Sequence, residues 1–233
     1  LQILLYGKNI AKYTPELSDG VQISNLTRVE NPNYLFLTVN TAGINRSEFH
    51  IVLKDKKKTV ASYRYELKTR RPDSAERASF TSADLFYLIM PDRFANGDPS
   101  NDSVASLTEK ANRANPDGRH GGDLRGIINH LEYIHDLGAT AVWLTPVCED
   151  NEKQTTYHGY AQTDLYKIDA RYGTNEEYRE LSQKLRDRKM KLVMDYVTNH
   201  WGSQHWMIKD LPSKDWIHYF DEGENGFVRS NYK

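Results

Sequence analysis

Three short apolar runs in the second part of the sequence are each followed directly by a cluster of polar residues. The runs are residues 85–90, 141–144 and 192–194, and each has the length and composition of a buried strand. Amphipathic helical patterns separate them. Strands that alternate with helices form a parallel sheet with right-handed crossovers, in which the carboxyl ends of the strands meet at one edge. The pattern predicts the beginning of a (β/α)8 barrel, with functional residues at those strand ends.

Two helices are expected between these strands. The first extends over residues 124–137, where apolar side chains recur at helical spacing and Gly138 provides a C-cap. The second extends from about residue 175 to residue 188 and buries Tyr178, Leu181 and Leu185. A closed TIM-type barrel needs eight strands and eight helices, so we expect an incomplete barrel in this α/β part of the chain.

The first part of the sequence has a different, β-like pattern. Short alternating or apolar segments at 2–6, 21–26, 34–40, 49–53 and 59–67 are separated by turn residues, which predicts a small all-β, immunoglobulin-like sandwich. A polar stretch at 69–82 has no hydrophobic periodicity and is typical of a linker. We therefore expect a sandwich with its linker at 1–80 and the first barrel elements at 81–195. The start of an insertion after the third strand, domain B, is expected at 196–233.

Composition narrows the classes of partner. With a net charge of -1 and 27% charged residues, the chain has no overall attraction to nucleic acid or to an anionic membrane, and no apolar run is long enough to span a bilayer. A single cysteine, Cys148, excludes an internal disulfide and a cysteine-based zinc cluster. Leu1 is not an initiator methionine, so we expect a processed or cut chain. A periplasmic or extracellular location is expected, with a cytoplasmic one left open.

The first polar cluster consists of short oxygen-bearing side chains. Asn96, Asp98, Asn101 and Asp102 are followed by Gly121-Gly122-Asp123. Calcium takes six to eight oxygen ligands from carboxylates, amides and carbonyls, so the cluster fits Ca²⁺, although it lacks the spacing of an EF-hand. The alternative is a set of Asx-turns without a metal.

The second and third clusters combine aromatic, imidazole and carboxylate groups. His158 and Tyr160 lie in a loop after the second strand, and Asp195 ends the third strand with His200 just beyond it. A sugar ring buries its C–H face against an aromatic ring while its hydroxyls bond to polar neighbours, so these residue types suit a carbohydrate. Core aromatics and a buried structural aspartate remain the alternative.

Taken together, the motifs resemble those of the α-amylase family of glycoside hydrolases. In chain order they are PDRFANGDPSND, HGGDLRGI, AVWLTP, HGYAQTDLYKID, YGT and VMDYVTNH, and they cover residues 85–200. The small β domain ahead of them is similar to the amino-terminal domain of the cyclomaltodextrinase and neopullulanase branch. The resemblance therefore implies a glycosidase acting on α-1,4-glucans, and this chain is expected to be its amino-terminal fragment.

The resemblance also implies roles for individual residues. The implied calcium ligands are Asn96, Asp98, Asn101, Asp102, Gly121 through its carbonyl, and Asp123. Tyr160 corresponds to the aromatic residue that stacks on the sugar at the cleavage point, and His158 and His200 to the histidines that bond to its hydroxyls. Asp195 corresponds to the acidic residue that orients these neighbours. Asn199 is left unassigned.

The family's catalytic carboxylates follow its fourth, fifth and seventh strands, and none of these strands is recognised before Lys233. We therefore assign no catalytic residue here and expect the retaining mechanism only in the complete enzyme. The implied partners are α-glucan oligosaccharides, cyclodextrins or pullulan, and a homodimer of the complete enzyme is left open. Two alternatives also stay open: a starch-binding relative without activity, and a transglycosylase or isomerase of the same fold.

Overall fold

The computed structural model describes residues 1–217 except 46, 71, 73, 77 and 78. They form two compact units. One consists of Leu1–Ala78 with the described part of Asp210–Tyr219, and the other is Ser79–Lys209. The insertion expected at 196–233 is thus divided between the two units up to residue 217, and its remainder lies outside the described residues. None of the helices described is long and apolar enough to cross a membrane.

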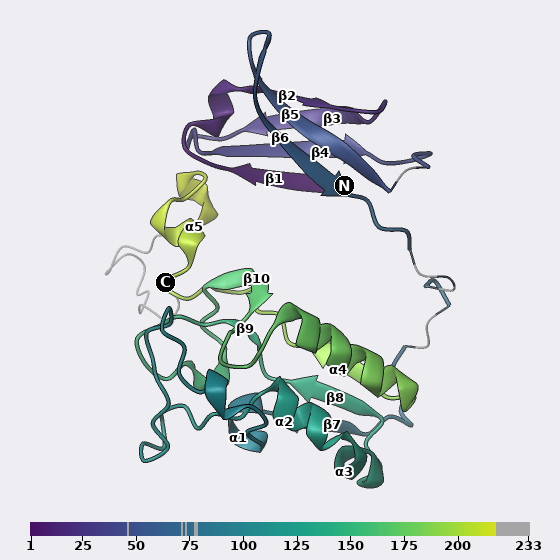
Figure 1. Cartoon of the computed structure of the whole chain (residues 1–233), viewed down its shortest axis with the longest axis vertical. Coiled ribbons are helices and arrows are strands. Elements are labelled where there is room, and N and C mark those ends of the chain that lie inside the picture. The colour runs from purple at the N-terminus through teal and green to yellow at the C-terminus, as the bar shows by residue number, and fades with distance from the viewer. Residues whose placement is uncertain (46, 71, 73, 77–78, 218–233) are drawn as a thin grey trace, which may run out of the picture. The chain divides into compact units, whose positions relative to one another are not determined.

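The first unit is built from two antiparallel three-stranded sheets, ordered β1-β4-β3 and β2-β5-β6 (Figure 1). The strands are β1 (Gln2–Tyr6), β2 (Thr14–Leu17), β3 (Gln22–Arg28), β4 (Tyr34–Asn40), β5 (Glu48–Asp55) and β6 (Lys58–Glu66), and a 3₁₀ turn, η1 (Ile10–Lys12), joins the first two. Leu37 and Val39 of β4 pack with Phe49 and Ile51 of β5 in one buried cluster. Side chains from both sheets therefore share a core, which confirms the predicted sandwich.

Strand β2 was not predicted. It contains Pro15, which has no N–H to donate and so is confined to sheet edges or bulges. In the structure β2 pairs only with β5 and lies at the edge of its sheet, where a proline is tolerated.

Asp210 anchors the later segment of this unit to the sandwich. Its carboxylate accepts hydrogen bonds from the hydroxyl of Tyr6 and the side-chain amide of Asn33, both at 2.8 Å. The backbone N–H of Asn31 donates to the carbonyl of Pro212 at 2.9 Å. Hydrogen bonds from Asn33, Asn31 and Tyr6 hold the pKa of Asp210 below its ordinary value. The segment ends in a 3₁₀ turn, η4 (Lys214–Trp216).

The second unit contains the predicted parallel sheet, ordered β11-β8-β7. Its strands are β7 (Phe86–Ile89), β8 (Ala141–Leu144) and β11 (Lys191–Met194), all in parallel register, and β9 (Cys148–Glu149) pairs with β10 (Asp164–Ile168) in a separate antiparallel ribbon. The helices are α1 (Pro91–Phe94), α2 (Leu124–Asn129), α3 (Leu131–Asp136), α4 (Asn175–Asp187) and α5 (Trp206–Lys209), with 3₁₀ turns η2 (Pro99–Asn101) and η3 (Thr156–His158). The order of strands and helices is the one predicted for the start of a barrel.

The single helix predicted over residues 124–137 is wrong in one respect, because it is interrupted at His130. The backbone there has φ −112° and ψ 17°, and the N–H of His130 bonds to the carbonyl of Ile127 in a tightened turn. The imidazole Nδ1 pairs with the carbonyl of Gly126 at 2.7 Å. The side chain thus competes for a helical carbonyl. The helix resumes as α3, which ends at Asp136, and Gly138 follows with the φ of +83° that suits the predicted cap.

Helix α4 agrees with its prediction and covers one face of the parallel sheet. Thr174 and Glu177 form a capping box at its start, and Leu181 and Leu185 are fully buried in the core. On the other face of the sheet, Phe86, Leu88 and Trp143 are exposed. We refer to these three residues as the open face.

Candidate functional site

The four residues predicted to bind sugar come together in the structure. Tyr160 lies just after η3, in the loops that follow β8, and its hydroxyl donates to the Oδ2 atom of Asp195 at 3.0 Å, immediately after β11. The Nε2 atom of His200 pairs with the backbone carbonyl of Tyr160 at 3.0 Å. The backbone N–H of Tyr160 donates to Nδ1 of His158 at 2.9 Å. One connected group therefore spans the carboxyl ends of two neighbouring strands.

The protonation states of this group suit recognition of hydroxyls. Burial lowers the pKa of His158, against an opposing effect of Glu109, so its imidazole is neutral near pH 7. Because Nδ1 accepts the N–H of Tyr160, the proton lies on Nε2, which can donate to a ligand. Burial and the hydrogen bond to Asp195 raise the pKa of Tyr160, and the residue is 38% exposed. The site thus offers an aromatic surface next to a hydrogen-bond donor.

Gly159 determines how His158 and Tyr160 are presented. Its φ is +78°, and a Cβ atom at this position would lie 2.0 Å from the carbonyl oxygen of Pro146. Only glycine fits this close approach of two backbones without displacing one of them. The imidazole and the phenol ring consequently lie with their centroids 5.8 Å apart.

The oxygen-rich loop around η2 has two unsatisfied acceptors. The side-chain oxygens of Asn96 and Asn101 are buried and have no hydrogen-bond partner among the described residues. The amide group of Asn96 donates to Oδ1 of Asp102 at 2.7 Å. Gly121 has φ +86°, and a Cβ there would lie 2.6 Å from the same carboxylate. Buried acceptors without donors, next to a carboxylate, fit a hard cation.

Asp123, another acidic residue near this loop, already accepts hydrogen bonds from backbone N–H groups. Asp123 caps α2 and accepts N–H groups from Gly97 at 3.1 Å, Asp98 at 2.8 Å and Gly126 at 2.6 Å. The N–H of Gly97 also reaches the second oxygen at 3.2 Å, so each oxygen of Asp123 accepts two N–H contacts and an ion would have to share these acceptors. The structure thus gives Asp123 a second role, which sequence reasoning did not assign: it holds the loop that carries Asp98.

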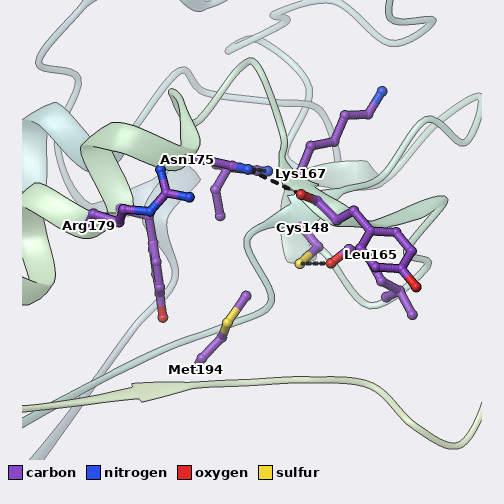
Figure 2. Close-up of a pocket in the computed structure, with 9 residues that line it drawn as sticks. Cys148, Leu165, Lys167, Asn175, Arg179 and Met194 are labelled. Carbon is purple, nitrogen blue, oxygen red and sulfur yellow. Dashed lines mark hydrogen bonds between the residues drawn. The ribbon is translucent and has the colours of Figure 1, made fainter. Parts of the chain in front are cut away.

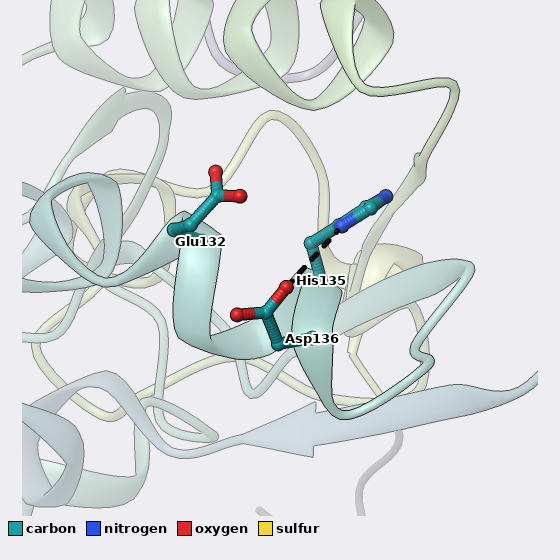
Figure 3. Close-up of side chains that lie close together, drawn as sticks. All are labelled: Glu132, His135 and Asp136. Carbon is teal, nitrogen blue, oxygen red and sulfur yellow. Dashed lines mark ion pairs between the residues drawn. The ribbon is translucent and has the colours of Figure 1, made fainter.

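A different group of titratable side chains is closer together than the carboxylates of this loop. Glu132, His135 and Asp136 on α3 place one ligand atom each within 4.8 Å of one another (Figure 3), and within the described part of the chain no other set of three histidines, cysteines or acids does so. All three are exposed and none has an orphaned buried atom. We assign no metal to them, because solvated acids on a helix surface need none.

A hollow beside β10 and α4 is an unsuitable candidate for the sugar site. Residues lining it include Cys148, Leu165 and Met194 (Figure 2), and none of the four predicted sugar-binding residues lies in it. Burial raises the pKa of Cys148 to about 11, so its thiol stays protonated and unreactive at neutral pH.

Several buried charged residues near the site were missed by sequence reasoning. Arg171 and Asp169 form a fully buried ion pair at 2.7 Å, and Arg119 is 1% exposed with its guanidinium 4.5 Å from the ring centre of Tyr172. Asp150 is also 1% exposed. In the sequence these residues look like ordinary polar loop positions, and only their partners in three dimensions distinguish them.

Comparison with known proteins gives matches over both units. The family model described as the catalytic domain of α-amylase matches residues 88–229, and the one described as the amino-terminal domain of cyclomaltodextrinase matches residues 1–71. Neopullulanase 2 of Thermoactinomyces vulgaris is 34% identical over 157 residues, which are 64% of this chain and 26% of that protein. Cyclomaltodextrinase of Thermoanaerobacter pseudethanolicus is 38% identical over 132 residues, 57% of this chain and 22% of that protein.

Solved structures agree with this result. An Anoxybacillus α-amylase superposes with a TM-score of 0.54 at 38% identity, over 62% of this chain and 30% of that one. The α-amylase of Geobacillus thermoleovorans, solved in complex with acarbose, superposes with a TM-score of 0.51 at 36% identity, over 60% of this chain and 28% of that one. The chain thus spans about a quarter of the length of the two curated relatives described above.

Proposed function

Because the chain belongs to the α-amylase family of glycoside hydrolases, we propose that the complete enzyme hydrolyses α-1,4-glucosidic bonds with retention of configuration. The substrate class we propose is maltooligosaccharides, cyclodextrins or pullulan. The similarity to a cyclomaltodextrinase and a neopullulanase supports this choice, as does the match of residues 1–71 to the amino-terminal domain of cyclomaltodextrinase. We assign no catalytic carboxylate among the residues of this chain.

The observation that carries the proposal is the hydrogen-bonded group of His158, Tyr160, Asp195 and His200 at the strand ends. Tyr160 would pack against the C–H face of the sugar, and the Nε2–H of His158 would donate to a sugar hydroxyl. Asp195 would fix the phenol ring through its hydrogen bond to the hydroxyl. His200 would bond to a second hydroxyl.

We also propose one bound Ca²⁺ in the loop around η2. Its ligands would come from Asn96, Asp98, Asn101 and Asp102, the carbonyl of Gly121 and the carboxylate of Asp123. The two orphaned amide oxygens support this assignment. The ion would neutralise the carboxylates and hold a long irregular loop at the first strand end, and it has no part in the chemistry that we propose.

The proposal is tested with the full-length enzyme on maltooligosaccharides, γ-cyclodextrin and pullulan, with product analysis by chromatography and the anomeric configuration followed by NMR. We expect shorter products of α configuration. Tyr160→Ala should lower kcat by about 10²–10³. Tyr166→Ala, at a residue of β10 that is 74% exposed, is the matched control and should leave turnover unchanged. Binding without turnover would instead support the non-catalytic alternative, and longer products would support a transglycosylase.

A further inference from the structure

The loop that carries His158 and Tyr160 is tied together by one buried carboxylate. The Oδ1 atom of Asp150 accepts the backbone N–H of Glu152 at 3.2 Å, and its Oδ2 atom accepts the backbone N–H of Ala161 at 3.2 Å. Glu152 lies at the start of this loop, and Ala161 follows Tyr160 directly. A single side chain thus fixes both ends of the segment that presents the candidate sugar-binding residues.

Glu152 connects this loop to the second loop of the site by hydrogen bonds. Its carboxylate accepts the backbone N–H of Gln204 at 2.8 Å and the hydroxyl of Ser203 at 2.9 Å, in the loop that follows His200. The same two loops meet at Gly202, where a Cβ atom would lie 2.2 Å from the carbonyl oxygen of Ala161. Asp150 and Glu152 therefore connect the loops after β8 and β11.

Asp150 is itself held from the interior. Its backbone N–H donates to the carboxylate of Asp169 at 3.1 Å, and its carbonyl accepts a hydrogen bond from Arg171. Because Asp169 and Arg171 form a fully buried ion pair, the carboxylate of Asp150 has a rigid base. The carboxylate of Asp150 can therefore hold the loops at the strand ends in a fixed position. Asp150 itself is not one of the residues proposed to touch sugar.

We propose that Asp150 is a positioning residue for glucan binding, which holds the Tyr160 loop directly and the His200 loop through Glu152. This inference rests on the proposed function, because it names a residue that supports the same sugar site.

The burial of the Asp150 carboxylate should also make sugar binding sensitive to pH. Burial raises the pKa of Asp150 to about 7, the neighbouring Asp169 adds to this, and the N–H groups of Glu152 and Ala161 together with Arg171 act against it. The ionised form is the stronger acceptor for these two N–H groups. Affinity for sugar should therefore fall as the pH drops through about 7. Burial lowers the pKa of His158 below the ordinary value for histidine, and loss of the step in Asp150→Asn would assign the step to Asp150 and not to His158.

The test is calorimetric titration of the full-length enzyme with acarbose, between about pH 6 and about pH 8.5, with the melting temperature of each variant measured in parallel. Asp150→Asn should bind acarbose about tenfold more weakly at the upper end of this range and should lose the step near pH 7. Glu152→Ala should weaken binding but keep the step, because Asp150 is intact. Asp136→Asn, the same substitution at an exposed carboxylate on α3, is the matched control and should bind as the wild type does.

An Asp150→Asn variant with wild-type affinity and an unchanged pH profile would overturn the inference while leaving the proposed function intact. A lower melting temperature with unchanged binding would do the same, since it would make Asp150 merely structural. If Asp150→Asn does not fold, Glu152→Ala decides, and unchanged affinity in that variant overturns the inference. Wild-type enzyme that binds neither acarbose nor maltooligosaccharides would instead refute the proposed function, and this inference with it.

Discussion

Removing Ca²⁺ should destabilise the unit that contains the loop around η2. The amide oxygens of Asn96 and Asn101 are buried without a donor, and each such acceptor costs about 1–3 kcal/mol. An ion that satisfies both would therefore contribute about 2–6 kcal/mol. Ligand linkage gives a compatible value, since free Ca²⁺ at about a thousand times its dissociation constant adds about 4 kcal/mol to the free energy of unfolding. For a domain of this size we expect chelation to lower the melting temperature by about 8–16 °C.

Scanning calorimetry with and without a chelator measures this shift, and isothermal titration gives the stoichiometry. Asn101→Leu should reduce Ca²⁺ affinity and the chelator effect together, because it removes one of the two orphaned oxygens. Asp136→Asn is the matched control, since it changes the exposed group on α3 and leaves the η2 loop untouched. Mg²⁺ should substitute poorly, because it demands a smaller octahedral site.

Two results would refute this reasoning. If the chelator leaves the melting temperature unchanged and titration shows no Ca²⁺ binding, the loop is a set of Asx-turns. If Asp136→Asn abolishes binding and Asn101→Leu does not, the ion lies on α3 instead. In either case the orphaned amide oxygens would require another partner, such as ordered water.

Three further predictions concern the sugar site and the parallel sheet. In the complete enzyme, Tyr160→Ala and His200→Ala should each lower kcat by about 10²–10³, because contacts at the cleaved sugar strengthen in the transition state, and a change in KM alone would contradict this. Gly159→Ala should lower the melting temperature and weaken sugar binding, because its Cβ would lie 2.0 Å from the carbonyl of Pro146, and a variant with wild-type affinity for acarbose would show that the loop adjusts. A polypeptide limited to residues 1–233 should self-associate through the open face, and a monodisperse monomer in size-exclusion chromatography would contradict this prediction.

Much of the fold could be predicted because its strands and helices carry clear periodic patterns. The parallel strands and α4 follow from apolar runs and helical spacing. Two of the differences from the prediction have local causes that periodicity does not contain. Pro15 makes the edge strand β2 hard to recognise, and the ring of His130 hydrogen-bonds to a carbonyl of its own helix. Side-chain competition for backbone groups is decided by rotamer and packing, which one sequence does not reveal.

The candidate site was predictable in its residues but not in its connections. The sequence placed His158, Tyr160, Asp195 and His200 at strand ends, and parallel strands bring those ends together. No pattern in the sequence indicates that Asp150 reaches Ala161, because a hydrogen bond from a backbone N–H to a side chain eleven residues away has no periodicity.

Most acidic residues around the site have a structural role, so the number of carboxylates there overestimates the number that contact the ligand. Loops at strand ends have backbone N–H groups without a helical or sheet partner, and buried ones must find an acceptor. Asp92 accepts from His120 and Gly121, and Glu109 accepts from Thr155 and Thr156, just as Asp123 and Asp150 serve their own loops. These four carboxylates hold the rim in place. Asp195 differs because it accepts a side-chain hydroxyl from an exposed ring, and this contact distinguishes a residue of the sugar site from one that supports it.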